Sequence, residues 1–249
     1  MKKTRHIWII SLFPEFFEAF LETGLAGQAL KGKRGVDLSV HLLQLRDFSG
    51  SSYKGVDDAP YGGGPGMVMR ADILKKALWE GVIEPGEYGP DYKEKLHVVF
   101  PGPRGKSWNQ EVCKDFSKRM GIEEGEGKDL VFICGRYEGI DERFIQAYVD
   151  EEISLGDYVL TGGELAVMTI IDSSLRFLPG VLGNRESFRQ ESFNNGLLEH
   201  PQYTRPRTFE GVDVPEVLLS GHHKKIKAFE QTESLRITKF YRPDLLECE

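Results

Sequence analysis

Residues 129–144 read DLVFICGRYEGIDERF and hold a strand, a glycine-bearing loop and the start of a helix. Asp129–Cys134 is a short apolar run typical of a buried strand, and Asp141–Val149 has a helical pattern. Charged side chains fill the loop and the first helical turn: Arg136, Glu138, Asp141, Glu142 and Arg143. A strand that leads directly into a helix is the repeating unit of parallel α/β sheets.

The same alternation covers the first 180 residues of the chain. Further strands are predicted at His6–Phe13, Val36–Leu45, His97–Phe100 and Glu152–Leu155. Further helices are predicted at Pro14–Leu30, Ala71–Val82, Ser107–Met120 and Glu164–Phe177. We therefore expect an α/β fold, with a mostly parallel sheet and helices on both of its faces.

The pattern changes after Pro179. Residues 180–211 are polar and rich in Gly, Asn, Arg and Pro, and a helical pattern returns at His222–Phe240. A long polar stretch of this kind is usually a functional loop or a linker. The sequence thus predicts a large domain at 1–182, an interdomain loop at 183–198 and a small helical domain at 199–249.

Charge and cysteine content narrow the class of protein. The net charge is −7, but residues 123–157 alone carry eleven acids and three bases, so the remaining chain is close to neutral. A basic face is therefore possible, with HHKKIK at 222–227 as its centre. Three cysteines without metal-site spacing favour a reducing cytoplasm, and no apolar run is long enough to span a membrane.

Three glycine-bearing loops follow three of the predicted strands. They are PGPRGKS (101–107), GRYEGIDER (135–143) and GDYVLTGGEL (156–165). Ligands of parallel sheets bind beyond the carboxyl ends of the strands, so these loops predict one composite pocket. The alternative is three ordinary strand–helix turns, in which glycine is also common.

The loop composition indicates which ligand such a pocket would take. GPRGKS is not a phosphate-binding loop, because Phe100 stands where that motif needs glycine, and no GxGxxG follows the first strand. The loop at 155–163 has apolar side chains and no Lys or Arg, which favours an adenine-like group without phosphates. Glu138 is a candidate for contact with a ligand or a metal. The alternative is that the charged residues at 136–143 form salt bridges that hold the start of a helix, with Asp141 as its N-cap.

Six motifs in register carry a resemblance over essentially the whole chain. They are PYGGGPGM (60–67), CGRYEGIDER (134–143), GDYVLTGGELAVMTIIDS (156–173), RFLPGVLG (176–183), ESFNNGLLEHPQYTRP (191–206) and VLLSGHHKKI (217–226). Together they resemble the bacterial tRNA (guanine-N1)-methyltransferase (TrmD) family of the SPOUT superfamily.

The resemblance implies a homodimer with active sites shared between subunits, a deep trefoil knot in the large domain, and S-adenosylmethionine as cofactor. By match, the cofactor-binding residues are Phe100, Pro101, Gly102, Pro103, Gly105, Gly135, Leu155, Gly156, Asp157, Tyr158, Val159, Leu160, Gly162 and Gly163. The reaction implied is methylation of N1 of the tRNA guanosine that follows the anticodon.

The resemblance also assigns roles outside the cofactor pocket. Arg176 and Glu191 match the catalytic arginine and base, and Glu138 and Glu191 match positions linked to Mg²⁺. Substrate-binding positions are Asp57, Gly66, Arg205, Arg207, His222 and Lys224, the last four in a C-terminal domain that grips tRNA. The family base is usually aspartate, so Glu191 retains the carboxylate with one additional methylene.

Two other functions remain open at this point. A SPOUT enzyme acting on another RNA would share the cofactor pocket, but we would not expect it to share RFLPGVLG. A non-catalytic RNA-binding module would have no need for Glu138, Arg176 and Glu191 in register.

Overall fold

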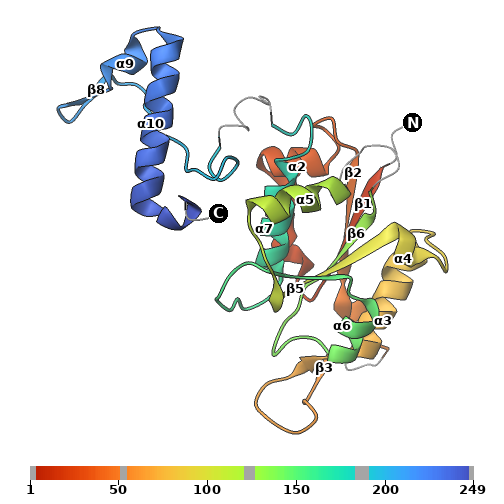
Figure 1. The fold of residues 1–249 in the computed structure, drawn as a ribbon. Helices are drawn as coiled ribbons and strands as arrows, with labels where there is room; N and C mark the ends of the chain where they lie inside the picture. Colours follow the sequence, from red (N-terminus) through yellow and green to blue (C-terminus); the bar gives the residue numbers. More distant parts are fainter. Residues whose placement is uncertain (1–3, 51–54, 121–126, 183–190, 247–249) are drawn as a thin grey trace. The chain divides into compact units, whose positions relative to one another are not determined.

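The computed structural model describes residues 4–50, 55–120, 127–182 and 191–246. The chain forms two compact units, Met1–Gly183 and Asn184–Glu249 (Figure 1).

A five-stranded parallel sheet is the centre of the first unit, in the order β2-β1-β6-β5-β7. Its strands are β1 (Arg5–Ser11), β2 (Leu38–Gln44), β5 (Leu96–Ser107), β6 (Asp129–Ile133) and β7 (Glu151–Ser154). Because all strands are parallel, their carboxyl ends meet at one edge of the sheet. The predicted α/β class and parallel sheet are confirmed.

Each face of the sheet has its own hydrophobic core, since neighbouring side chains of a strand point to opposite faces. In β1, Ile7 and Ile9 belong to one core, whereas Trp8 and Ile10 belong to the other. Figure 1 shows α2, α5 and α7 on one side of the sheet and α3 and α6 on the other. The helices of this unit are α1 (Glu18–Glu22), α2 (Gly24–Leu30), α3 (Ala71–Leu78), α4 (Tyr92–Lys95), α5 (Gln110–Met120), α6 (Glu142–Tyr148) and α7 (Glu164–Leu175), with short 3-10 or π turns at Pro14–Phe17, Leu45–Phe48 and Trp79–Ile83.

Two predicted helices are interrupted. The one predicted at Pro14–Leu30 breaks at Thr23, whose backbone is extended, and Gly24, whose φ is +65°. The one predicted at Ala71–Val82 ends as an α-helix at Leu78 and continues as a π turn. Glycine at position 24 supplies the left-handed conformation that redirects the first of these helices.

The second unit is mainly helical, as predicted for the C-terminal part of the chain. Its long helix is α10 (His223–Tyr241), preceded by α9 (Glu216–Leu219) and followed by a 3-10 turn at Pro243–Leu246. A small hairpin, β8 (Thr208–Phe209) and β9 (Val212–Asp213), stands before α9. None of the helices in the described ranges combines the length and apolar character needed to cross a bilayer.

Candidate active site

One cavity of about 250 Å³ lies at the carboxyl ends of β6 and β7, beside the middle of β5 at Phe100–Pro103. All three glycine-bearing loops contribute to its wall. The lining residues are Phe100, Pro101, Gly102, Pro103, Gly135, Arg136, Tyr137, Glu138, Gly139, Ile153, Ser154, Leu155, Gly156, Tyr158, Val159, Leu160, Thr161, Gly162, Gly163 and Ala166. The structure therefore brings the three loops together at one site.

Of the residues predicted to bind the cofactor, Gly105 and Asp157 are absent from this lining. A Cβ on Gly105 would lie 2.3 Å from the backbone nitrogen of Ile153, so this glycine allows close packing between β5 and β7. Asp157 is the middle residue of a tight turn in which Tyr158 N–H donates to Gly156 O over 2.9 Å, and it is exposed.

The first predicted loop is in fact part of a strand. β5 continues from Leu96 to Ser107, where we predicted a strand ending at Phe100. Its pairing with β7 shifts register between Pro101 and Lys106, so the residues between them bulge out and form a wall of the cavity. Proline and glycine hid this strand from the sequence pattern, because both are unusual within a sheet.

Arg136 is the one Lys or Arg side chain in the described lining, and it is fully engaged. Its Nε donates to Glu164 Oε1 over 3.2 Å and its Nη1 donates to Thr161 O over 3.1 Å. Glu164 is 1% exposed, and its Oε2 forms an ion pair with Arg136 Nη2 at 2.9 Å. Among the described residues, no donor has the geometry of a hydrogen bond to that oxygen, so the contact is an ion pair only. The pair fixes the loop at 161 to the end of β6.

Gly162 leaves room for the Arg136 side chain, and two aromatic residues that follow β1 pack against its guanidinium. A Cβ at position 162 would lie 2.2 Å from Arg136 Nε. The guanidinium stands 4.6 Å from the ring centre of Phe13 and 5.4 Å from that of Phe16. With its charge neutralised in this way, Arg136 is not available for a phosphate, which agrees with the predicted phosphate-free ligand.

Cys134, at the end of β6, is fully buried close to this ion pair. Burial, together with the negative charge of Glu164, raises the pKa of its thiol well above the ordinary value. A thiolate nucleophile is therefore strongly disfavoured at this position.

The glycine-rich stretch at 60–67 packs against the loop that carries Glu138. Gly66 has φ +86°, and a Cβ there would lie 2.4 Å from Glu138 Oε1. Glu138 N–H donates to Met67 O over 3.0 Å, so two backbone segments run side by side at this point. A residue with a side chain at position 66 would displace Glu138 from its place in the cavity wall.

This contact continues into a small antiparallel pair of strands. β3 (Asp57–Asp58) pairs with β4 (Val68–Met69), and Asp57 stands opposite Met69. Met69 in turn forms a bridge with Ile140. The candidate substrate residues Asp57 and Gly66 are thus connected through the backbone to the Glu138 loop.

Asp141 caps α6, as the alternative reading of this segment anticipated. Its Oδ1 accepts from Arg143 N–H over 2.9 Å, and its Oδ2 accepts from Arg143 Nη2 over 2.6 Å. Hydrogen bonding to Arg143 holds the pKa of Asp141 below its ordinary value. Asp141 therefore has a structural role at the helix start.

Arg176 lies at the other end of α7 from the cavity. It lines a second cavity of about 320 Å³ with Phe20, Thr23 and Asp172, among other residues. The cavity at the three glycine-bearing loops touches α7 at its first turn, and the twelve residues of Glu164–Leu175 rise roughly 18 Å. Within one chain, Arg176 does not line the cavity formed by the three glycine-bearing loops.

The remaining candidates belong to the second unit. Glu191 is half-buried, and the candidate tRNA contacts are all exposed: Arg205, Arg207, His222 and Lys224. In the described ranges no three His, Cys, Asp or Glu side chains cluster as metal ligands would. Glu138 by itself does not constitute a metal site.

Comparison with known proteins identifies the family. The profile described as "tRNA (Guanine-1)-methyltransferase TrmD" matches residues 5–248. A tRNA (guanine-N(1)-)-methyltransferase of Clostridium beijerinckii is 50% identical over 239 residues, which are 96% of this chain and 91% of that protein. Proteins with the same name from two other bacteria are also similar. The one from Haemophilus influenzae is 46% identical over 97% of this chain and 91% of that protein, and the one from Clostridioides difficile is 45% identical over 95% of each. The chain belongs to the tRNA (guanine-N1)-methyltransferase (TrmD) family of SPOUT enzymes, which use S-adenosylmethionine.

Proposed function

We propose that this protein transfers the methyl group of S-adenosylmethionine to N1 of guanosine 37 in tRNA, the residue after the anticodon. The observation that carries this proposal is the family match over residues 5–248, which includes every candidate site residue. We also infer a cytoplasmic location, because tRNA substrates are found there.

The cavity beside the bulge of β5 and the carboxyl ends of β6 and β7 is proposed to hold the cofactor. Its wall is apolar, with exposed Tyr158, Val159 and Leu160 able to clasp a nucleobase and backbone groups of the glycine loops able to read its edge. Arg136, the one Lys or Arg in the described lining, is ion-paired with Glu164 and so is not available to bind a phosphate. This agrees with a nucleoside ligand that carries no phosphates. When bound, S-adenosylmethionine supplies an activated methyl group attached to sulfonium.

The residues of the chain would then act on the guanine. N1 of neutral guanine carries a proton, and we assign its removal to the carboxylate of Glu191. The charge that develops towards O6 would be stabilised by the guanidinium of Arg176. The wall at 60–67, rich in glycine and seated against Glu138, would let backbone approach the base closely.

A homodimer with shared active sites explains the distribution of these groups. Arg176 is separated from the cofactor cavity by the length of α7, and Glu191 belongs to the other structural unit. In a homodimer, the second copy can supply its Arg176 and Glu191 to the cavity of the first copy. The trefoil knot implied by the family stays a prediction, which knot analysis of an experimental structure would test.

Mg²⁺ also stays a prediction. Since the described residues show no cluster of three ligands, the ion would have to complete its coordination with water or RNA atoms beside Glu138.

Methyl transfer from labelled S-adenosylmethionine to an unmodified tRNA transcript tests the proposal. Activity should require guanosine at position 37 and fall by about 10²–10⁴-fold in Glu191→Gln, the usual contribution of a general base. Glu191→Asp, which restores the usual family residue, should stay active. Parallel assays with Mg²⁺ and with EDTA report on the metal, and light scattering reports on the dimer.

Other outcomes would separate the parts of this proposal. A wild-type rate in Glu191→Gln would remove the base assignment and leave the family activity intact. No methyl transfer to any tRNA by protein that binds S-adenosylmethionine would indicate a different RNA substrate.

A further inference from the structure

The segment that carries Glu191 is folded against the C-terminal unit. Residues 191–199, here named the Glu191 loop, close on themselves through backbone hydrogen bonds. Glu191 O accepts from Asn194 N–H over 3.3 Å, and Phe193 N–H donates to Leu197 O over 2.8 Å. The place of Glu191 therefore depends on where the rest of this loop is held.

Thr238 of α10 is the first anchor of the loop. Its Oγ1 accepts from Leu198 N–H over 2.9 Å, and its side chain is completely buried. The same hydroxyl donates to Ser234 O over 2.6 Å. Because its proton is committed to the helix carbonyl, a lone pair is left for the N–H of half-buried Leu198, which would lose this acceptor if the hydroxyl were removed.

Arg242, at the end of α10, is the second anchor. Its guanidinium lies 5.7 Å from the ring centre of Phe193 and is oriented by hydrogen bonds to Asp244 of 2.9, 3.2 and 2.7 Å. Phe193 has φ +74°, an uncommon conformation for an aromatic residue that persists only where the surroundings hold it. Two contacts from one turn of α10 thus fix two points of the Glu191 loop.

We propose that Thr238 and Arg242 are positioning residues for the methyl transfer. They hold the loop that carries the base, and they do so from the unit that also carries the tRNA contacts Arg205 and Lys224. The inference rests on the proposed function, and it adds that one rigid unit delivers both the RNA grip and the base. Binding of tRNA to this unit then brings Glu191 to the target guanine.

The test compares Thr238→Val, which keeps the side-chain shape and removes the acceptor, with Thr238→Ser, which keeps it. We expect kcat to fall about 10- to 100-fold in Thr238→Val, the effect of misplacing a reacting group by about 1 Å. KM for S-adenosylmethionine and Kd for tRNA should stay within about two-fold, and Thr238→Ser should recover the rate. Hydrogen exchange of the Leu198 amide should accelerate in Val and not in Ser.

Thr232→Val is the matched control. Thr232 is exposed on the same helix, and its hydroxyl makes the same kind of bond, to Ala228 O over 2.9 Å. It should have the wild-type rate. Arg242→Gln, at a partly exposed site where unfolding is not expected, should repeat the loss of kcat without loss of tRNA binding.

Two results would overturn the inference while Glu191→Gln remains inactive. One is faster Leu198 exchange in Thr238→Val with unchanged kcat, since the anchor would then not position the base. The other is an equal loss of tRNA affinity and kcat, which would assign α10 to RNA binding alone. A fully active Glu191→Gln would instead show that the proposed base is wrong, and the positioning role would fail with it.

Discussion

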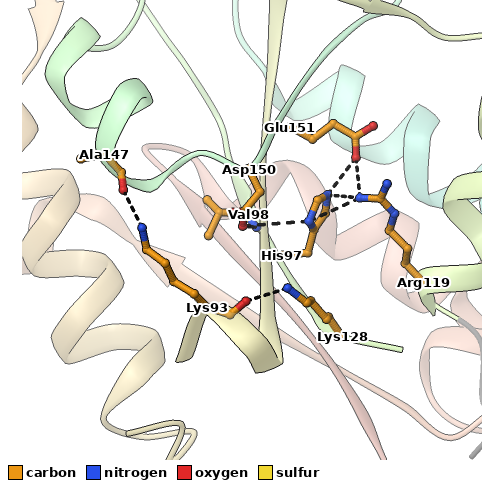
Figure 2. A network of polar contacts seen from close by, with 8 residues as sticks. All are labelled: Lys93, His97, Val98, Arg119, Lys128, Ala147, Asp150 and Glu151. Atoms are coloured by element: carbon orange, nitrogen blue, oxygen red, sulfur yellow. Dashed lines mark hydrogen bonds and ion pairs between the residues drawn. The ribbon is translucent and has the colours of Figure 1, made fainter. Parts of the chain in front are cut away.

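The two ends of the parallel sheet carry different kinds of residues. At the amino ends of β5 and β7, charged side chains bind one another in a dense network, shown in Figure 2. At the opposite end, beside the bulge of β5 and the carboxyl end of β7, glycine, backbone groups and apolar side chains surround a cavity, and the Arg136–Glu164 ion pair supports its wall. At the amino end the charged side chains bind one another, whereas at the cavity backbone polar groups can bind a ligand.

The network at the amino end connects several strands and helices. His97 Nε2 lies 2.8 Å from Glu151 Oε2, and Arg119 Nη1 donates to the same carboxylate over 2.9 Å. Val98 N–H donates to Asp150 Oδ2 over 2.8 Å, which ties β5 to the turn before β7. Lys93 and Lys128 donate to backbone carbonyls nearby, as Figure 2 shows. Such an end stabilises the fold and leaves little for binding.

We expect the largest effect from breaking the Arg136–Glu164 ion pair beside the cavity. Glu164→Gln would leave the charge of Arg136 buried without its partner, and we expect a loss of about 3–5 kcal/mol in the free energy of unfolding. Cofactor affinity should fall with it, because Arg136 also holds Thr161 O. Urea unfolding and calorimetric titration of S-adenosylmethionine measure the two effects.

Glu142→Gln is the matched control for that variant. Glu142 is likewise the first residue of a helix, but it is exposed in its pair with Arg104 at 3.0 Å. Removing this surface charge should change stability by less than about 1 kcal/mol. Equal effects of the two variants would contradict a special role for the buried pair.

A smaller effect is expected where backbone packs on backbone. Gly105→Ala places a methyl group 2.3–2.5 Å from backbone atoms of Glu152 and Ile153, so the bulge of β5 must move. We expect about 1–3 kcal/mol of destabilisation, as for overpacking in general, with weaker cofactor binding. Gly50→Ala, where no atom lies within 4 Å of the added Cβ, should be neutral in both assays. An unaffected Gly105→Ala would show that the β5–β7 contact adapts freely.

The smallest effect is predicted for the amino end, and it depends on pH. The hydrogen bond from His97, followed by the charge of Arg119, outweighs burial and lowers the pKa of Glu151. A carboxylate with a lowered folded pKa stabilises above its unfolded pKa, and this stability is lost as pH falls through the folded value. Glu151→Gln should therefore cost about 1 kcal/mol at neutral pH, close to the net value of one hydrogen bond.

The pH dependence provides the check on that prediction. The difference between wild type and Glu151→Gln should shrink as pH falls below the ordinary carboxyl pKa of 4.5. Methyl transfer and cofactor binding should not change, because Glu151 is at the amino end of β7, away from the cavity. A pH-independent difference would mean that packing, and not charge, is what Glu151 contributes.

Local pattern in the sequence was enough to predict the five strands of the sheet and most of the residues that line the cavity. Apolar runs located five strands, since a buried strand must be apolar, and glycine after three of them indicated the shared pocket. The absence of Lys and Arg from 155–163 already pointed to a ligand without phosphates. Asp141 could be recognised as a possible cap because capping depends on a few neighbouring residues.

Only the tertiary structure decided the relations between distant segments. It showed that β5 continues through a bulge, that Gly105 serves packing, and that Gly66 is a glycine because Glu138 lies against it. It placed Arg176 at the far end of α7 and anchored the Glu191 loop on Thr238. Sequence pattern reports which side chains face a core, while close approach between two backbones leaves no periodic signal. For this reason the packing roles of Gly66 and Gly105, and the separation of Arg176 from the cavity within one chain, followed from the folded chain alone.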